Sequence, residues 1–203
     1  MIELNNREIA GKILVELGHE PTAGQQQLTD MLADFVAQPV SPKQRQAFLI
    51  KGYAGTGKTT LVSALVRVLP LVGMQSVLLA PTGRAAKVLS GYSRKQALTI
   101  HRKIYKAVTR ADGRLTMGPG QNPHKYTLFI VDEASMIPGS DSSADQGIYQ
   151  HRDLLDDLIN YVFSSEGCKL LLIGDTAQLP PVGTDQSPAL SPEALERSYH
   201  LDI

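Results

Sequence analysis

The sequence predicts an α/β fold, in which a parallel sheet is covered by helices on both faces. Four short apolar runs are separated by stretches with helical periodicity. The runs are apolar throughout rather than alternating, as expected of strands that are buried on both faces. Polar or glycine-rich segments follow these runs directly, and sheets of this kind bind ligands at the carboxyl ends of their strands. The sequence therefore predicts both the architecture and the edge of the sheet where a site should lie.

The composition restricts the class of protein. The chain has 203 residues, of which 42% are apolar, as is usual for one well-buried domain. It contains no apolar stretch of membrane-spanning length, its first residues are not a secretory signal, and its one cysteine, Cys168, cannot form an internal disulfide. We therefore expect a cytoplasmic protein without a membrane partner. The 20 basic and 20 acidic residues balance, so net charge alone predicts no nucleic-acid partner.

The chain is expected to begin with a helical segment, residues 1–43, ahead of a main domain at residues 44–203. An amphipathic helix is predicted over residues 3–17, with an asparagine as its cap and a glycine at its end. A loop at residues 20–24 leads to a second predicted helix over residues 25–36. Two prolines then break the chain before the first strand.

The first strand, residues 48–50, is followed by a loop with the spacing G-x-x-x-x-G-K-[ST]. Its glycines allow backbone N–H groups to turn toward a phosphate, and the helix predicted at residues 59–69 adds the positive end of its dipole. Lys58 supplies a cation for the β- and γ-phosphates, and the Thr59 hydroxyl suits a magnesium ligand. The motif predicts that ATP and Mg²⁺ bind here. The residues expected to hold the nucleotide in this loop are Gly52, Ala54, Gly55, Thr56, Gly57, Lys58, Thr59 and Thr60.

The middle of the chain continues the alternation of strands and helices. An apolar strand is predicted over residues 76–80, and Thr82 is placed to cap the helix that follows. Thr99 is placed to cap a further helix over residues 100–108. Residues 111–125 are rich in glycine, proline and asparagine, so we expect a loop or an irregular hairpin there.

Basic residues are concentrated in this middle region. Between Arg84 and Arg110 the chain carries eight basic residues and no acidic one. Such segregation can give a neutral protein a basic face. A solvated helix surface explains the same run, and charge alone does not decide between the two.

Two adjacent carboxylates follow the third predicted strand, residues 126–131. Asp132 can hold the magnesium shell, and Glu133 can orient or deprotonate an attacking water. Alone, such a pair is weak evidence for chemistry. Together with the phosphate loop, it predicts a nucleotide-hydrolysing site.

The last third of the chain is predicted to contain a polar insertion at residues 138–150, a helix at 152–163 and a fourth strand at 169–173. The fourth strand ends in a turn that leads to Gln178. The amide of Gln178 could sense a γ-phosphate, although a plain strand-ending turn explains the segment equally well. Residues 199–203 are expected to begin another strand.

Together, five segments resemble the motifs of the first RecA-like motor domain of superfamily 1 DNA helicases of the RecD/Dda type, including the exodeoxyribonuclease V alpha subunit. In the order of the family's motifs I, Ia, Ib, II and III, they are Gly52–Thr59, Ala80–Lys87, Thr99–His101, Asp132–Ser135 and Gly174–Val182. Upstream, Thr22–Gln25 resembles the adenine-reading Q motif, where Gln26 and Gln27 compete with Gln25 for the role.

The resemblance implies an ATP-dependent helicase motor that moves 5′ to 3′ along single-stranded DNA. It implies that Gln25 binds adenine and that Thr59 and Asp132 hold the magnesium. The catalytic residues that it implies are Lys58, Asp132, Glu133 and Gln178. The DNA contacts that it implies are Thr82, Arg84, Lys87, Thr99 and His101.

A motor of this type has two RecA-like domains, and the second supplies an arginine to the nucleotide. No later motif occurs before Ile203, so we expect a fragment that binds ATP and Mg²⁺ weakly, hydrolyses ATP slowly and lacks the second domain. Two other classes of function stay open. They are a different phosphate-loop ATPase that does not act on nucleic acid and a non-catalytic ATP-binding interaction module. The sequence does not predict other partner subunits.

Overall fold

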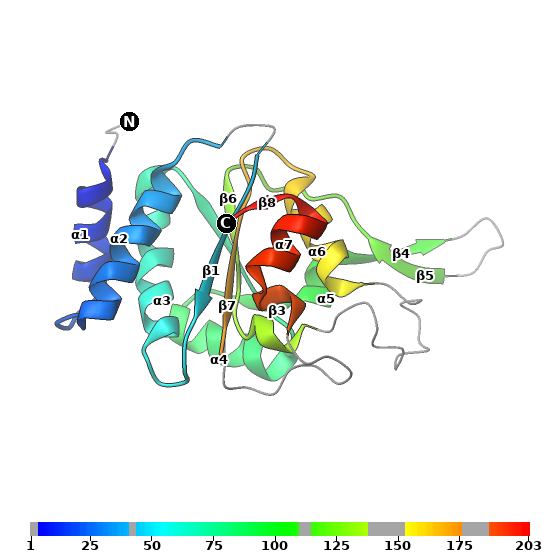
Figure 1. Cartoon of the computed structure of the whole chain (residues 1–203). Helices are drawn as coiled ribbons and strands as arrows, with labels where there is room; N and C mark the ends of the chain where they lie inside the picture. The colour runs from blue at the N-terminus through cyan, green and yellow to red at the C-terminus, as the bar shows by residue number, and fades with distance from the viewer. Residues whose placement is uncertain (1–3, 41–43, 110–114, 138–152, 176–186) are drawn as a thin grey trace.

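The computed structural model describes residues 4–40, 44–109, 115–137, 153–175 and 187–203. A six-stranded sheet of order β3-β2-β6-β7-β1-β8 lies at its centre (Figure 1), and all its neighbouring strands are parallel. The strands are β1 (Arg45–Lys51), β2 (Gln75–Ala80), β3 (Ala97–Thr99), β6 (Thr127–Val131), β7 (Lys169–Gly174) and β8 (Leu201–Asp202). The predicted parallel sheet is therefore confirmed. Its four predicted strands are β1, β2, β6 and β7.

Helices cover both faces of the sheet, as predicted. One face carries α1 (Asn6–Leu17), α2 (Ala23–Ala37), α3 (Lys58–Val68) and α4 (Gly83–Ser93), and the other carries α5 (Ile100–Ile104), α6 (Leu154–Phe163) and α7 (Pro192–Tyr199). The described residues also form three short 3₁₀ helices, η1 (Leu69–Val72), η2 (Ala134–Met136) and η3 (Pro188–Leu190).

Each face of the sheet has its own apolar core. Successive strand residues point to opposite faces, so Ile130 of β6 lies in the core under α3 while its neighbour Phe129 lies in the core under α6. Both side chains are fully buried. This double burial is the physical reason that the strands are apolar throughout rather than alternating.

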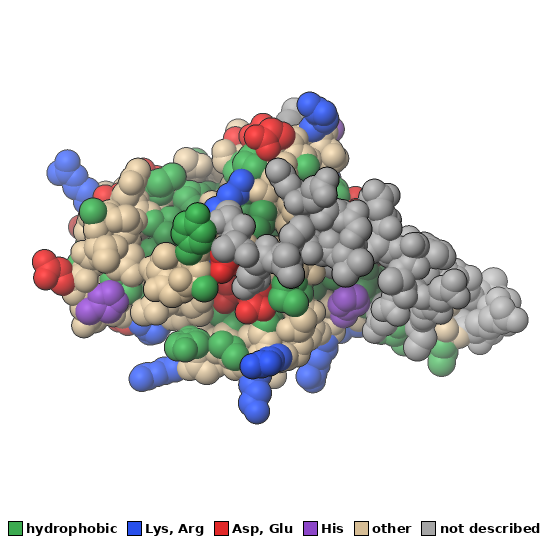
Figure 2. Space-filling view, turned by 60° about the horizontal axis from the view of Figure 1, so that its bottom comes forward, with side chains coloured by type: hydrophobic (Ala, Val, Ile, Leu, Met, Phe, Trp, Pro, Cys, Tyr) green, Lys and Arg blue, Asp and Glu red, His purple; other side chains and the backbone are tan. Residues whose placement is uncertain are grey.

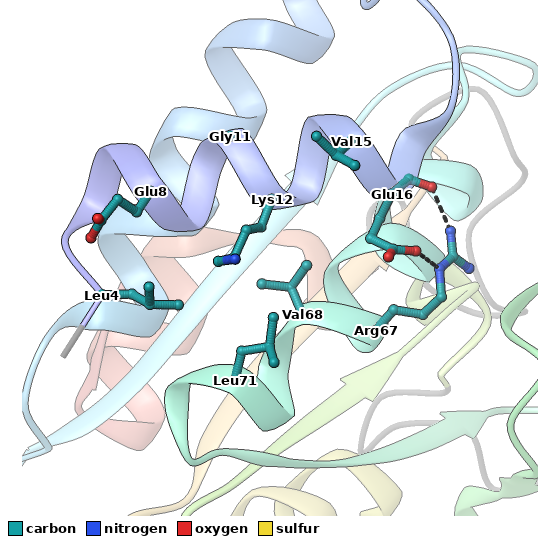
Figure 3. Close-up of a pocket in the computed structure, with 9 residues that line it drawn as sticks. All are labelled: Leu4, Glu8, Gly11, Lys12, Val15, Glu16, Arg67, Val68 and Leu71. Carbon is teal, nitrogen blue, oxygen red and sulfur yellow. Dashed lines mark hydrogen bonds and ion pairs between the residues drawn. The ribbon is translucent and has the colours of Figure 1, made fainter. Parts of the chain in front are cut away.

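The first two helices share the core on the α3 side of the sheet. Arg67 of α3 donates to the Glu16 carboxylate at 2.6 Å and to the Glu16 carbonyl at 2.7 Å, which ties the end of α1 to α3. A groove of about 560 Å³ remains between α1 and the end of α3 with η1 (Figure 3). Its lining residues are Leu4, Glu8, Gly11, Lys12, Val15, Glu16, Arg67, Val68 and Leu71. The domain boundary at residue 43 stays a prediction.

Three helix caps lie where the sequence predicts them. The side chain of Asn5 accepts from the Glu8 N–H at 3.0 Å, and Thr82 and Thr99 each accept, at 3.2 Å, from the N–H three residues ahead. Gly18 ends α1 in the left-handed conformation with φ of 77°. These caps satisfy backbone donors and acceptors that the helices cannot pair themselves.

The predicted helix over residues 100–108 is wrong beyond Ile104. The chain becomes extended at Tyr105, and β4 (Tyr105–Thr109) pairs with β5 (Leu115–Pro119) as an antiparallel hairpin. The β-branched Val108 and Thr109 favour this strand. The hairpin projects from the body of the domain (Figure 1), and its second strand lies in the segment where an irregular hairpin was expected.

The predicted loop at residues 20–24 is wrong at its end, because α2 already begins at Ala23. The Thr22 hydroxyl accepts from the Gln25 N–H, and the Gln25 side-chain oxygen accepts from the Thr22 N–H at 3.1 Å. This reciprocal capping box starts the helix earlier than the apolar periodicity indicates.

Three smaller expectations meet different outcomes. The strand expected near the end of the chain is present as β8. The sequence did not predict β3 or α7. The polar insertion at residues 138–150 lies outside the described residues. Within the described part of the chain, no helix is long and apolar enough to cross a membrane.

We predict a pH-dependent contribution of Lys169 to stability. This first residue of β7 is fully buried, and burial lowers its pKa from 10.5 to about 8. Between these values the unfolded chain binds more protons than the folded protein, so stability should rise with pH, by at most about 1.4 kcal/mol for each pKa unit. We expect the unfolding free energy of the wild type minus that of Lys169→Met to increase from pH 8 to pH 10 in urea titrations. A difference that stays constant or falls would contradict the assignment.

Candidate active site

Most of the residues predicted to bind the phosphates and the metal meet at the carboxyl edge of the sheet. A cavity of about 360 Å³ opens there. Figure 2, turned to bring this edge forward, shows acidic side chains near the middle of the view and several basic side chains along its lower outline. The cavity is lined by Ala54, Gly55, Gly57, Lys58, Thr59, Thr60, Val88, Tyr92, Asp132, Glu133, Gly174 and Asp175. They come from the ends of β1, β6 and β7 and from the helices α3 and α4.

The loop between β1 and α3 has the backbone that a phosphate loop requires. Gly55 and Gly57 have φ of 78° and 82°, in the left-handed region that side chains disfavour. Gly57 is the N-cap of α3, and no side chain caps this helix, whereas side chains cap each of the other described α-helices. The first N–H groups of α3 and the positive end of its dipole therefore face the cavity without a side-chain acceptor.

Lys58 brings a positive charge to the same place. Its Nζ donates to the carbonyl oxygens of Gly52 and Tyr53, both at 2.6 Å. The ammonium therefore lies over the loop, next to the N-terminus of α3. Neutral carbonyls are weaker partners for an ammonium than an anion would be, so a phosphate can compete for these hydrogen bonds.

Asp132 lies across the cavity from the loop, at the end of β6. One of its carboxylate oxygens accepts from the Thr59 hydroxyl at 3.4 Å, and the other accepts from the Glu133 N–H at 2.9 Å. Burial raises the pKa of Asp132, and these hydrogen bonds together with the charge of Lys58 oppose that rise. A desolvated carboxylate beside a hydroxyl is the set of oxygen donors that a hard divalent cation such as Mg²⁺ prefers.

Glu133 adopts an unusual backbone conformation beside Asp132. Its φ of 55° is in the left-handed region, where a residue with a Cβ is strained. Burial and then the charge of Asp132 raise the pKa of Glu133, while the charge of Arg84 lowers it. The two adjacent carboxylates therefore have different surroundings, as a metal ligand and a water-activating base require.

Gln25 lies against the phosphate loop, at the start of α2. Its side-chain nitrogen donates to the Thr56 carbonyl at 3.4 Å. Gln26, one of its competitors, instead bonds Asp30 along the helix at 3.3 Å. Of these two glutamines, Gln25 is the one that contacts the loop.

The residues predicted to contact DNA lie near the same edge. Thr82 follows β2 and caps α4, and Thr99 is the last residue of β3 and caps α5. Arg84 and Lys87 are exposed on α4. The ring of His101, on α5, lies 5.5 Å from the ring of Tyr105. Not all of the basic run shares this edge, because Lys95 turns to Ser76 near the start of β2, at 2.7 Å.

The structure adds cavity residues that the sequence reasoning missed. Val88 and Tyr92 of α4 are exposed by 51% and 62% and line the cavity. Their i, i+4 spacing on an otherwise polar helix face was the available signal. Asp175, which belongs to the predicted motif at residues 174–182 but was given no role there, follows β7, is buried and also lines the cavity. Gln178 lies outside the described residues.

The fold and this site define a phosphate-loop nucleotide-binding domain of the RecA-like α/β class. The chain belongs to the AAA domain family (AAA_30), which matches residues 33–202. Together with the relatives described next, this membership confirms the resemblance to superfamily 1 helicases of the RecD/Dda type.

Three of the relatives are named as helicases. The ATP-dependent RecD2 DNA helicase of Deinococcus radiodurans is 34% identical over 137 residues, which cover 66% of this chain and 16% of the relative. The ATP-dependent DNA helicase dda of Enterobacteria phage T4 is 30% identical over 155 residues, covering 74% and 32%. The ATP-dependent DNA helicase PIF7 of Trypanosoma brucei brucei is 28% identical over 181 residues, covering 82% and 15%. The chain therefore spans about a third or less of the length of these relatives.

A solved structure supports the fold independently of sequence. The large terminase of bacteriophage HK97 resembles the domain with a TM-score of 0.55 at 12% identity, covering 93% of this chain and 41% of that one. At this identity the likeness shows the fold alone.

We predict that Gly57→Ala destabilises the protein. The left-handed backbone should cost about 1–2 kcal/mol, and the new Cβ would also overlap the Gln25 side-chain nitrogen. The matched control is Gly11→Ala on the exposed face of α1, where a Cβ meets nothing within 4 Å. This control should be neutral or should stabilise by up to about 1 kcal/mol. Thermal unfolding of both variants tests the prediction, and an equal effect of the two substitutions would contradict it.

Proposed function

We propose that this chain is the ATP-binding half of a DNA helicase motor, which couples ATP hydrolysis to movement along single-stranded DNA and to unwinding. The observation that carries the proposal is the uncapped N-terminus of α3, with Lys58 and Thr59, facing Asp132 and Glu133 across one cavity. Three relatives named as ATP-dependent DNA helicases support a helicase motor over an ATPase that does not act on nucleic acid and over a non-catalytic ATP-binding module.

Each residue at the cavity has a proposed part in nucleotide binding and hydrolysis. The N–H groups from Ala54 to Thr60 and the ammonium of Lys58 bind the phosphates, and Gln25 binds the adenine. Gly52 lies at the start of the loop, where its N–H donates to the Gly174 carbonyl at 3.3 Å. The Thr59 hydroxyl and the Asp132 carboxylate hold Mg²⁺, which when bound neutralises charge on the phosphates. Glu133 orients the attacking water and accepts its proton. Gln178 is proposed to couple the γ-phosphate to the DNA-binding face.

The DNA is proposed to contact the carboxyl edge beyond the nucleotide. Arg84 and Lys87 contribute charge toward the phosphate backbone, and Thr82, Thr99 and His101 lie near the same edge of the sheet. Contacts to the phosphate backbone tolerate any base sequence and weaken with salt. We propose that movement along the strand runs 5′ to 3′ by alternate closing and opening against a second RecA-like domain.

The second domain is proposed to supply an arginine that stabilises charge in the transition state. Without such an arginine, hydrolysis is slower by about 10³ to 10⁵. These 203 residues alone should therefore bind ATP with Mg²⁺ and turn it over slowly, whether or not single-stranded DNA is present. Fast, DNA-stimulated turnover by this chain in a steady-state ATPase assay would contradict this part of the proposal.

We predict that two substitutions separate binding from chemistry. Lys58→Ala removes the cation at the phosphates and should lower the affinity for ATP with Mg²⁺ by at least about 100-fold, since a charge-assisted hydrogen bond contributes about 1.5–3 kcal/mol and Lys58 makes more than one. Glu133→Gln keeps the size of the side chain and should leave affinity within about threefold while it abolishes residual hydrolysis. Calorimetric titration and single-turnover hydrolysis measure the two effects. Unchanged affinity with Lys58→Ala, or unchanged hydrolysis with Glu133→Gln, would contradict the assigned roles.

We predict that Arg84→Ala and Lys87→Ala each weaken the binding of single-stranded oligonucleotides of any sequence. Each should also reduce the slope of log affinity against log salt by up to about 0.7, the value for one phosphate contact to a single strand. The control is Lys12→Ala. Lys12 is a basic residue of α1 and lines the groove between α1 and α3, away from the nucleotide cavity. Fluorescence anisotropy between 50 and 200 mM salt tests this. Equal slopes for all three variants and the wild type would refute the proposed DNA face.

A further inference from the structure

Lys169 is a buried cation that the nucleotide site does not use. It is the first residue of β7 and is 0% exposed. Its Nζ donates to the carbonyl oxygens of Phe35 and Gln38, the latter at 2.7 Å, and lies 4.9 Å from the centre of the Phe35 ring. Among the described residues, no carboxylate forms an ion pair with it. Its partners are therefore the end of one helix and an aromatic ring.

These contacts fix the C-terminal end of α2. Phe35 lies in the last turn of the helix, and Gln38 is its C-cap. The last carbonyl groups of a helix have no partner within it and carry the negative end of the dipole. The last turn of α2 contains no basic residue of its own. Lys169 thus provides, from the amino edge of the sheet, the positive charge and the donors that this helix end lacks.

The opposite end of α2 lies at the phosphate loop. There the Gln25 side chain contacts the Thr56 carbonyl, and its backbone carbonyl accepts from the buried Thr29 hydroxyl at 2.7 Å. The Gln25 side-chain nitrogen lies 2.4 Å from the position that a Cβ on Gly57 would take. The 15 residues of α2 therefore form a rod of about 22 Å between Lys169 and the nucleotide site.

We propose that Lys169 is a positioning residue for the nucleotide base: by holding the C-terminal end of α2, it sets the position of Gln25 beside the phosphate loop. This inference rests on the proposed role of Gln25 in binding adenine. A helix is stiff along its axis, so a shift at the Lys169 end is carried to the Gln25 end. Misplacement by about 1 Å is enough to weaken a recognition contact strongly. The phosphate contacts lie on the loop and on α3, so they do not depend on α2 in the same way.

The test compares two ligands, ATP and inorganic tripolyphosphate, each with Mg²⁺, by calorimetric titration of the whole chain. Lys169→Met keeps the length of the side chain but removes its donors. We expect it to lower affinity for ATP by about tenfold and affinity for tripolyphosphate by less than about twofold, a difference of about one kcal/mol or more. Gln25→Ala should show the same selective loss. In the Gln25→Ala background, Lys169→Met should then change ATP affinity by less than about twofold, because both substitutions remove one coupled contact.

Two controls separate positioning from a general loss of stability. Lys95→Met removes a different lysine, which is only partly buried and donates to Ser76, and should leave both affinities unchanged. Phe35→Leu removes the ring beside Nζ and should cause a weaker, equally selective loss, so it replaces Lys169→Met if that variant does not fold.

The outcomes distinguish the inference from the function on which it rests. Equal losses for both ligands would show a purely structural role for Lys169, and additive losses in the double variant would show that it does not act through Gln25. Either result overturns the inference and leaves the proposed function standing. A wild-type chain that binds neither ligand would overturn the proposed function and the inference together.

Discussion

The uncapped N-terminus of α3 is the feature on which the site depends. The glycine-rich turn lets the chain pass from β1 into the helix without a side chain to accept its first N–H groups. These groups and Lys58 gather positive charge at one end of the cavity, and the strand order places β7 between this loop and the carboxylates of β6. The sheet thereby holds opposite charges apart across a space in which a metal-bound phosphate group is electrostatically favoured.

Most of the fold could be predicted because the relevant signals are local. The middle of a strand buried on both faces is apolar at successive positions, so β1, β2, β6 and β7 are evident as short apolar runs in the sequence. Asn5, Thr82 and Thr99 cap helices through hydrogen bonds to residues three positions ahead. The edge strands β3 and β8 have only three and two residues and are too short for a pattern. The β4–β5 hairpin depends on the pairing of two separate segments of the chain, and this pairing overrides the longer helix that was predicted after Thr99.

The candidate site also contains residues that the sequence predicts and residues that only the fold reveals. The residues of the phosphate loop and the adjacent Asp132 and Glu133 could be predicted because their chemistry is concentrated in short segments. Val88 and Tyr92 line the cavity because α4 packs beside α3, and their i, i+4 spacing alone does not indicate what they face. Lys169 contacts carbonyl groups that lie 134 and 131 positions earlier in the chain, so its role in the fold appears only in three dimensions. Lysine at the start of a strand otherwise suggests a solvated end.

The central claim is that the loop before α3 grips the triphosphate of a nucleotide. It is tested most directly by following the backbone amide resonances of Gly55, Gly57 and Thr59 while a non-hydrolysable ATP analogue is added with Mg²⁺. The account predicts large, saturable shifts in these amides, because an anion would become the acceptor that the helix end lacks. Saturable shifts confined to other parts of the chain, or none at all, would contradict it.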